Sequence, residues 1–219
     1  MKKTITVTKD GPFIFNSIEK IQTQNGNQIE LKETTSICRC GESFEKPFCD
    51  GSHIIFDFKD EKDVYRVPDK IDVYKGKIIT IYDNRSVCSH RGICYEELSE
   101  VFKMSGGVFI DPDGADVDKI IDICKRCPSG ALSYSINESK RNLEAEEGDW
   151  EVRLAPRRYG YDGPIEVRGD VELIDEAGSH PESSEHYALC RCGKSKNMPF
   201  CSGEHWKAKF IDENNDEYI

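Results

Sequence analysis

The side chains best suited to chemistry in this 219-residue chain are its cysteines, six of which fall into two clusters with one spacing, Cys-x-Cys-x₈-Cys-x₃-His. The clusters are Cys38, Cys40, Cys49 and His53, and Cys190, Cys192, Cys201 and His205. Thiolates and imidazoles bind zinc and iron, so four such side chains in a short segment, found twice, predict two metal sites. A disulfide between Cys38 and Cys40 is disfavoured, because residues two apart seldom meet disulfide geometry.

Both clusters belong to an internal repeat. A shift of 152 residues places Gly11-Pro12 on Gly163-Pro164 and each cluster residue on its counterpart, without a gap. Short β-type runs open each copy. They are Ile5-Thr6-Val7, Phe13-Ile14-Phe15, Ile165-Glu166-Val167 and Val171-Glu172-Leu173. We therefore expect two copies of one small, β-rich module around a different middle segment.

The string Cys49-Asp50-Gly51-Ser52-His53, preceded by Cys38-x-Cys40, resembles the CDGSH (NEET) iron–sulfur family. The second copy, Cys201-Ser202-Gly203-Glu204-His205, keeps the ligand positions and departs at the Asp and Ser of the motif. The resemblance implies one [2Fe–2S] cluster per copy, with the Cys-x-Cys pair on one iron and the last cysteine and the histidine on the other. Zinc is the competing metal, although zinc modules usually carry Cys-x₂₋₄-Cys knuckles.

Histidine ligation has two chemical consequences. It makes the cluster less negative than four cysteines would, which raises the reduction potential, and it makes the site acid-sensitive because only neutral imidazole binds iron. Asp50 and Ser202 are both good helix N-caps, so a helix start is expected at each site. The second cluster segment carries more positive charge than the first, which predicts a higher potential there.

A third set of cysteines lies between the repeats, in Cys88-Ser-His90-Arg91-Gly-Ile-Cys94 and, further on, Cys127-Pro128. The pattern resembles the divergent mono-cluster 4Fe–4S domain over residues 70–137, with Arg91 where a ferredoxin loop would have another cysteine. Three cysteines suit a [3Fe–4S] cluster, or a [4Fe–4S] cluster with a fourth ligand. Cys124 and His90 are the candidates for that ligand, and each also fits a plainer role as a core cysteine or a hydrogen-bonding histidine.

The elements that must position these cysteines can also be predicted. Residues 71–83 suggest a hairpin that turns at Lys75-Gly76, and residues 131–136 suggest a closing strand. Asp116 is a plausible N-cap for a helix through Lys125. Its apolar face follows a helical period and comprises Val117, Ile120, Ile121 and Cys124.

Composition narrows the classes of protein. The net charge is -11 with no basic stripe, which disfavours a nucleic-acid partner. No run of about eighteen apolar residues is present, so no membrane span is expected. The basic start has no apolar segment behind it, so no secretory signal is expected either. Clustered cysteines then fit a cytoplasmic, reducing compartment.

Together these features predict an α+β protein with three domains, at residues 1–60, 61–147 and 148–219. We expect the two CDGSH modules to pair as an intramolecular pseudo-dimer, because their own cores are small. No phosphate loop, nucleophile elbow or HExxH motif is present, so an enzyme is not expected. The leading hypothesis is electron transfer with a separate oxidoreductase. The alternatives are a redox or acid sensor that transfers clusters, and a structural zinc protein.

Overall fold

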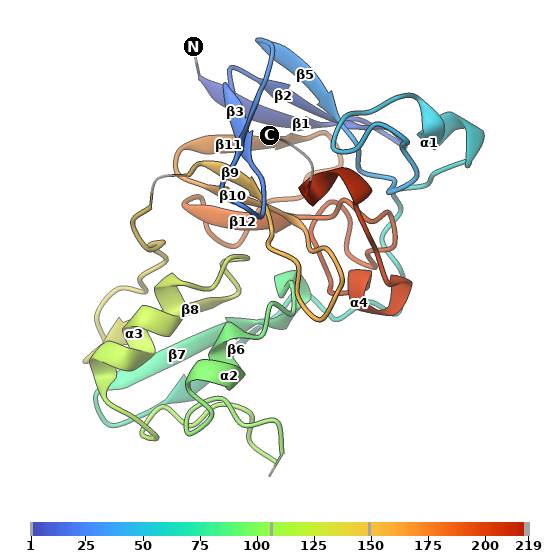
Figure 1. The fold of residues 1–219 in the computed structure, drawn as a ribbon. Coiled ribbons are helices and arrows are strands. Elements are labelled where there is room, and N and C mark those ends of the chain that lie inside the picture. Colours follow the sequence, from blue (N-terminus) through green and yellow to red (C-terminus); the bar gives the residue numbers. More distant parts are fainter. Residues whose placement is uncertain (1, 106, 149, 217–219) are drawn as a thin grey trace.

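The computed structural model describes residues 2–105, 107–148 and 150–216 and has an α+β fold, as expected. Figure 1 shows two sheets from the ends of the chain lying above a separate sheet from its middle. No helix in the described ranges is long and apolar enough to span a membrane.

The two repeats share their sheets. The first sheet has the order β11-β1-β2-β5, and the second has the order β12-β10-β9-β3-β4. Their strands are β1 (Lys3–Val7), β2 (Phe13–Asn16), β3 (Lys20–Gln22), β4 (Gln28–Glu30), β5 (Thr34–Ile37), β9 (Val152–Leu154), β10 (Ile165–Arg168), β11 (Val171–Asp175) and β12 (His186–Leu189). All four β-type runs expected from the sequence are strands.

Strand exchange between the repeats is nearly symmetric. β11 of the second copy pairs in parallel with β1 of the first, and β3 of the first copy pairs in parallel with β9 of the second. Alternating apolar residues from both ends therefore point into one common core. Its largest members include Ile5, Phe13, Phe15, Ile21, Ile37, Leu154, Ile165, Val167, Tyr187 and Leu189. The expected boundaries near residues 60 and 148 remain predictions, whereas these sheets are common to both ends.

The two repeats differ in the length of the connection between their first two strands. The hairpin between β1 and β2 has a five-residue connection (8–12), whereas the one between β9 and β10 has ten residues (155–164). The gapless match of the two copies therefore begins only at the Gly-Pro that ends each connection.

The middle segment builds its own three-stranded antiparallel sheet, β6-β7-β8. Its elements are β6 (Ile71–Lys75), β7 (Ile79–Asn84), the 3₁₀ turn η1 (Arg85–Val87), α2 (Ile93–Glu97), α3 (Val117–Lys125) and β8 (Leu132–Ile136). The hairpin, the helix and the closing strand agree with the sequence predictions. The buried face of α3 centres on Ile120, Ile123 and Cys124, with Val117 and Ile121 only partly buried.

A helix begins at each metal loop, but its N-cap lies one or two residues after the predicted one. The short helix α1 (Ser52–Ile55) has Gly51 at its N-cap, and α4 (His205–Ala208) has Glu204 there. Asp50 Oδ1 still accepts a hydrogen bond from the N–H of Ser52, the first residue of α1, at 2.9 Å. Asp50 Oδ2 and Ser202 Oγ also accept from backbone N–H groups six residues earlier in the loop, Phe44 N at 2.9 Å and Lys196 N at 3.0 Å. The role that the Asp-to-Ser exchange preserves is closure of the metal loop.

Candidate metal centres

The four ligand side chains of the first CDGSH motif lie on the segment that leaves β5 and on α1. Cys38 Sγ and Cys40 Sγ are 3.7 Å apart, and Cys49 Sγ lies 3.4 Å from His53 Nδ1. The second motif reproduces these distances between Cys190 and Cys192 and between Cys201 and His205.

These separations fit two ligands on one tetrahedral ion. With metal–sulfur bonds of about 2.3 Å and metal–nitrogen bonds of about 2.0 Å, two sulfurs lie about 3.8 Å apart and a sulfur–nitrogen pair about 3.6 Å apart. Among the residues that the structure describes, no three His, Cys, Asp or Glu side chains converge on one ion. Each motif therefore presents its four side chains as two pairs, each with the separation of two ligands on one ion.

The first cysteine of each motif is prepared for ligation. The pKa of Cys38 is lowered because the Cys40 thiol donates a hydrogen bond to it, with further donation from the backbone of Ser43 and Gly41. The pKa of Cys190 is lowered in the same way by Cys192. The lowered pKa favours the thiolate form of the first cysteine in each pair, and the second thiol must release its proton as iron binds.

The arginine inside each Cys-Arg-Cys triplet points away from the ligands and into the protein. Arg39 Nε donates to Gly11 O at 2.7 Å and its Nη2 binds Asp60 at 2.6 Å, while Arg191 Nε donates to Gly163 O at 2.8 Å. Each arginine therefore fastens the metal loop to the hairpin of its own repeat. The internal repeat could have indicated these arginine–aspartate pairs, because Asp60 and Asp212 also match at the 152-residue shift. The sequence analysis missed them.

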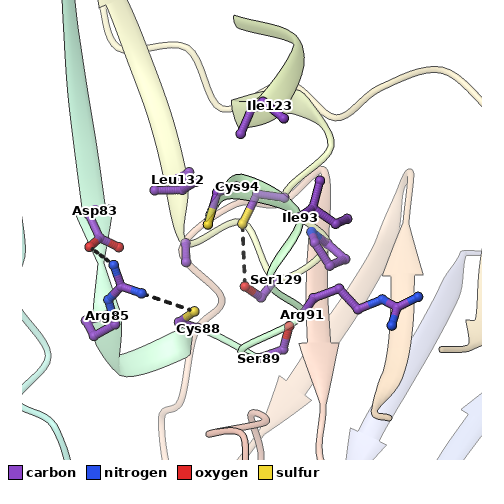
Figure 2. A pocket seen from close by; sticks show the side chains of 14 residues that line it. Asp83, Arg85, Cys88, Ser89, Arg91, Ile93, Cys94, Ile123, Ser129 and Leu132 are labelled. Carbon is purple, nitrogen blue, oxygen red and sulfur yellow. Dashed lines mark hydrogen bonds and ion pairs between the residues drawn. The ribbon is translucent and has the colours of Figure 1, made fainter. Parts of the chain in front are cut away.

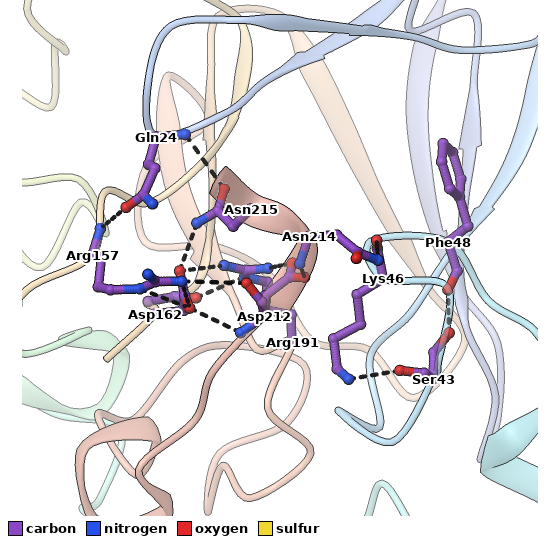
Figure 3. Close-up of polar contacts among 11 residues, drawn as sticks. Gln24, Ser43, Lys46, Phe48, Arg157, Asp162, Arg191, Asp212, Asn214 and Asn215 are labelled. Carbon is purple, nitrogen blue, oxygen red and sulfur yellow. Dashed lines mark hydrogen bonds and ion pairs between the residues drawn. The ribbon is translucent and has the colours of Figure 1, made fainter. Parts of the chain in front are cut away.

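Figure 3 shows the second of these arginine networks, in which Arg191 meets both Asp212 and Asp162. The adjacent C-terminal turn also binds the first repeat. Asn214 Nδ2 donates to Lys46 O at 2.8 Å, and Gln24 N donates to Asn215 Oδ1 at 3.4 Å. The two metal loops are therefore held in one rigid frame.

The two sites differ in exposure. His205 is 3% exposed and all three cysteines of its site are buried. Cys49 and His53 are only half-buried, and Phe44, Ile54 and Ile55 beside them are largely exposed. Burial lowers the pKa of His205 to about 4. The first site is therefore open to solvent and partners, and the second is enclosed.

The two metal loops touch across the pseudo-symmetry axis. A Cβ atom on Gly41 would lie 2.6 Å from Cys192 O, and one on Gly193 would collide with Cys40 O. Both glycines also have positive φ, at 81° and 71°, which only glycine adopts without strain. The four Cys-x-Cys sulfurs accordingly belong to one buried cluster with Phe58, Met198 and Phe210.

The three middle cysteines line one small hollow. Figure 2 shows the side chains of Cys88 and Cys94 directed into it from the loop and from α2. Cys127 also lines it. Burial raises the pKa of Cys88 to about 11 and of Cys94 to about 12, so these thiols lose protons only when metal binds at neutral pH.

Neither candidate for the fourth ligand lines this hollow. Cys124 is buried in the core behind it, where α3 contributes Ile123 instead, and His90 lines a separate hollow with Tyr159 and Trp206. Both assignments remain predictions. Arg91 extends away from the sulfurs toward Glu166, 3.9 Å away (Figure 2).

Arg85 is a site residue that the sequence analysis missed. Its Nη1 lies 3.6 Å from Cys88 Sγ, and its Nη2 binds the buried Asp83 at 2.5 Å. A guanidinium held beside a ligand sulfur stabilises negative charge on a cluster. Only its position three residues before Cys88 could have indicated this role.

Comparison with known proteins agrees with these sites. The family model described as "Iron-binding zinc finger CDGSH type" matches residues 10–54 and 162–206, and the one described as "Divergent 4Fe-4S mono-cluster" matches residues 74–137. "Uncharacterized protein YjdI" of Escherichia coli strain K12 is 36% identical over 61 residues, which make up 28% of this chain and 80% of that protein. Its counterpart in strain O157:H7 gives the same values. No solved structure matches the chain.

Paired ligands at both ends, a three-cysteine hollow between them and these family matches together define an iron–sulfur protein. The chain belongs to the CDGSH family, with two CDGSH-type domains and one divergent 4Fe–4S mono-cluster domain between them.

Proposed function

We propose that this protein transfers single electrons to or from a separate oxidoreductase and does not itself catalyse a reaction. The observation that carries the proposal is the direct contact of the two CDGSH loops through Gly41 and Gly193. An electron carrier needs its redox centres close together, because the rate of electron transfer falls steeply with distance. A zinc scaffold or a cluster donor has no such need.

The proposal includes the cofactors: one [2Fe–2S] cluster at each CDGSH motif, and a [3Fe–4S] or [4Fe–4S] cluster at Cys88, Cys94 and Cys127. It treats the two CDGSH repeats as an intramolecular pseudo-dimer, supported by the exchange of β3 and β11. A cytoplasmic location is proposed because all ten cysteines are free thiols. The partner is a redox protein rather than a nucleic acid or a membrane.

Anaerobic reconstitution followed by iron and sulfide quantification and EPR tests the proposal. A carrier takes up and returns electrons from a single-electron donor while its iron content stays constant. A colourless, zinc-filled protein would contradict it.

Cluster donation is the second candidate, and the openness of the first site favours it. A cluster beside the half-buried Cys49 and His53 is accessible to an acceptor. Donation would be supported if the first site transferred iron and sulfide to an apo-acceptor faster than it cycled between its oxidised and reduced forms.

A further inference from the structure

The middle domain is seated on one CDGSH loop and not on the other. In the second loop, a Cβ atom on Gly203 would lie 2.5 Å from Cδ2 of His90, so the imidazole of His90 occupies the space beside this glycine. The equivalent Gly51 in the first loop has no atom within 4 Å of that position.

A second contact fixes the same pairing. Asn197, in the second metal loop, donates from Nδ2 to Ser86 O at 2.9 Å, just before Cys88, and is itself buried. The corresponding residue of the first repeat is Glu45, which is exposed. These two contacts join the second CDGSH loop to the loop that carries Cys88, whereas their counterparts Gly51 and Glu45 have an open position and an exposed side chain.

His90 and Gly203 link two ligand sulfurs. The backbone N–H of Gly203 donates to Cys201 Sγ at 3.4 Å, and the backbone N–H of His90 donates to Cys88 Sγ at 3.4 Å. His90 has a positive φ of 55°, a backbone conformation that non-glycine residues seldom adopt. This conformation lets its amide face one sulfur while its ring covers Gly203.

We propose that His90 is the bridge between the second CDGSH centre and the middle centre, and that electrons pass through the three centres in the order first CDGSH, second CDGSH, middle, or the reverse. The inference rests on the proposed electron-transfer function. With both centres loaded, the step at His90 would take one electron from the reduced centre that Cys190, Cys192, Cys201 and His205 hold, and would reduce one ferric iron of the middle centre. No bond is broken and no proton moves, and the electron enters from a single-electron carrier protein.

The test uses the full chain with all centres reconstituted anaerobically. One electron is injected by a light pulse through a photosensitiser, and rapid-freeze EPR follows its movement between the second CDGSH centre and the middle centre. His90→Gly keeps the amide and the positive φ but removes the ring. We expect it to slow this movement by on the order of tenfold, equivalent to about 1.4 kcal/mol in the barrier.

Two further variants separate a bridge from a merely structural role. His90→Phe restores a flat ring over Gly203 and should restore the rate, while His180→Gly, at an exposed histidine, should leave it unchanged. Iron content and the potentials of both centres should equal those of the parent in every variant. Equal rates in parent and His90→Gly, with all centres intact, would overturn the bridge.

A spectroscopic comparison decides the matter if His90→Gly loses its middle centre. In the fully reduced parent, spin coupling to the middle centre should persist in Cys49→Ala and vanish in Cys201→Ala. The opposite pattern, or no coupling, would overturn the proposed order. Centres that accept no electron from any single-electron donor would refute the proposed function itself, whereas uptake without dependence on His90 refutes only the bridge.

Discussion

The histidine ligands show how one residue type behaves differently in two copies of a motif. Imidazole binds iron only when neutral, so protonation opens the site. His53 is half-buried and reachable by solvent, whereas burial lowers the pKa of His205 to about 4. Because a lowered pKa keeps the ring neutral to lower pH, the second site should survive acid that destroys the first.

Acid bleaching should therefore occur in two phases as the pH falls, the first from the more exposed His53 site. His53→Cys should remove the early phase, because cysteine ligation takes away the imidazole, and His205→Cys should remove the late one. Visible absorbance after pH jumps, with EPR to identify the remaining centre, measures this. Equal bleaching rates in the parent and both variants would argue against histidine ligation.

Arg85 should set the potential of the middle centre. Removing a positive charge beside Cys88 favours the oxidised cluster, so Arg85→Gln should lower the potential by on the order of tens of millivolts. Arg85→Lys keeps the charge and should stay near the parent value. Arg126→Gln, at the C-cap of α3 where the guanidinium pairs with Glu97, serves as the control, and EPR-monitored redox titration measures all four proteins. A drop in both Arg85 variants would contradict a charge effect.

The candidate ligands could be selected from sequence, because spacing, repetition and residue type are local information. The residues that hold them in place could not. Arg39 depends on a hairpin carbonyl 28 residues away, and His90 acts through Gly203, more than a hundred residues later. Such partners are fixed only by the packing of the folded chain.

Among the elements, the strands, the middle hairpin and α3 followed their hydrophobic periodicity. The exchange of β3 and β11 did not follow from it, since alternation indicates which face of a strand is buried and not which strand lies beside it. The helix N-caps at the metal loops differ from the prediction for another reason. Asp and Ser side chains bind nearby backbone N–H groups in many turns, and here the metal loop uses them.

Shared sheets predict cooperative loss of both CDGSH sites. Ile5 lies opposite Leu173 in the exchanged β1–β11 pair and is fully buried. Ile5→Ala should cost about 2–5 kcal/mol in the free energy of unfolding and should release iron from both sites in one transition. Ile174→Ala, on the same β11 but 40% exposed, is the matched control and should cost far less. Denaturant unfolding followed by circular dichroism and visible absorbance would reveal separate transitions if the repeats were independent.

For the whole molecule, the structure changes the expected order of potentials. The charge count along each loop favours a higher potential at the second site, but Lys194 pairs with Glu42 of the first loop and Arg191 pairs with Asp212. The second site is also enclosed and adjoins the anionic middle centre, and both features disfavour the additional negative charge of reduction.

The second CDGSH centre should therefore have the lower potential of the two. EPR-monitored titration of Cys49→Ala and Cys201→Ala, each with one CDGSH centre left, assigns the values. A higher potential at the second centre would show that loop charge outweighs burial. The Lys194→Gln variant separates the effect of loop charge from the effect of burial. Because the charge of Lys194 is already paired with Glu42, its removal should shift either reduction potential only slightly.

The longer β9–β10 connection of the second repeat makes the two repeats inequivalent. Two identical repeats would present two equivalent faces, and the middle domain could pack against either one. The additional residues carry Arg158 and Tyr159, which both bind Glu96 of the middle domain, and the first repeat has no counterpart to them. A five-residue lengthening of one connection thus gives the middle domain an anchor on the second repeat that the first repeat does not offer.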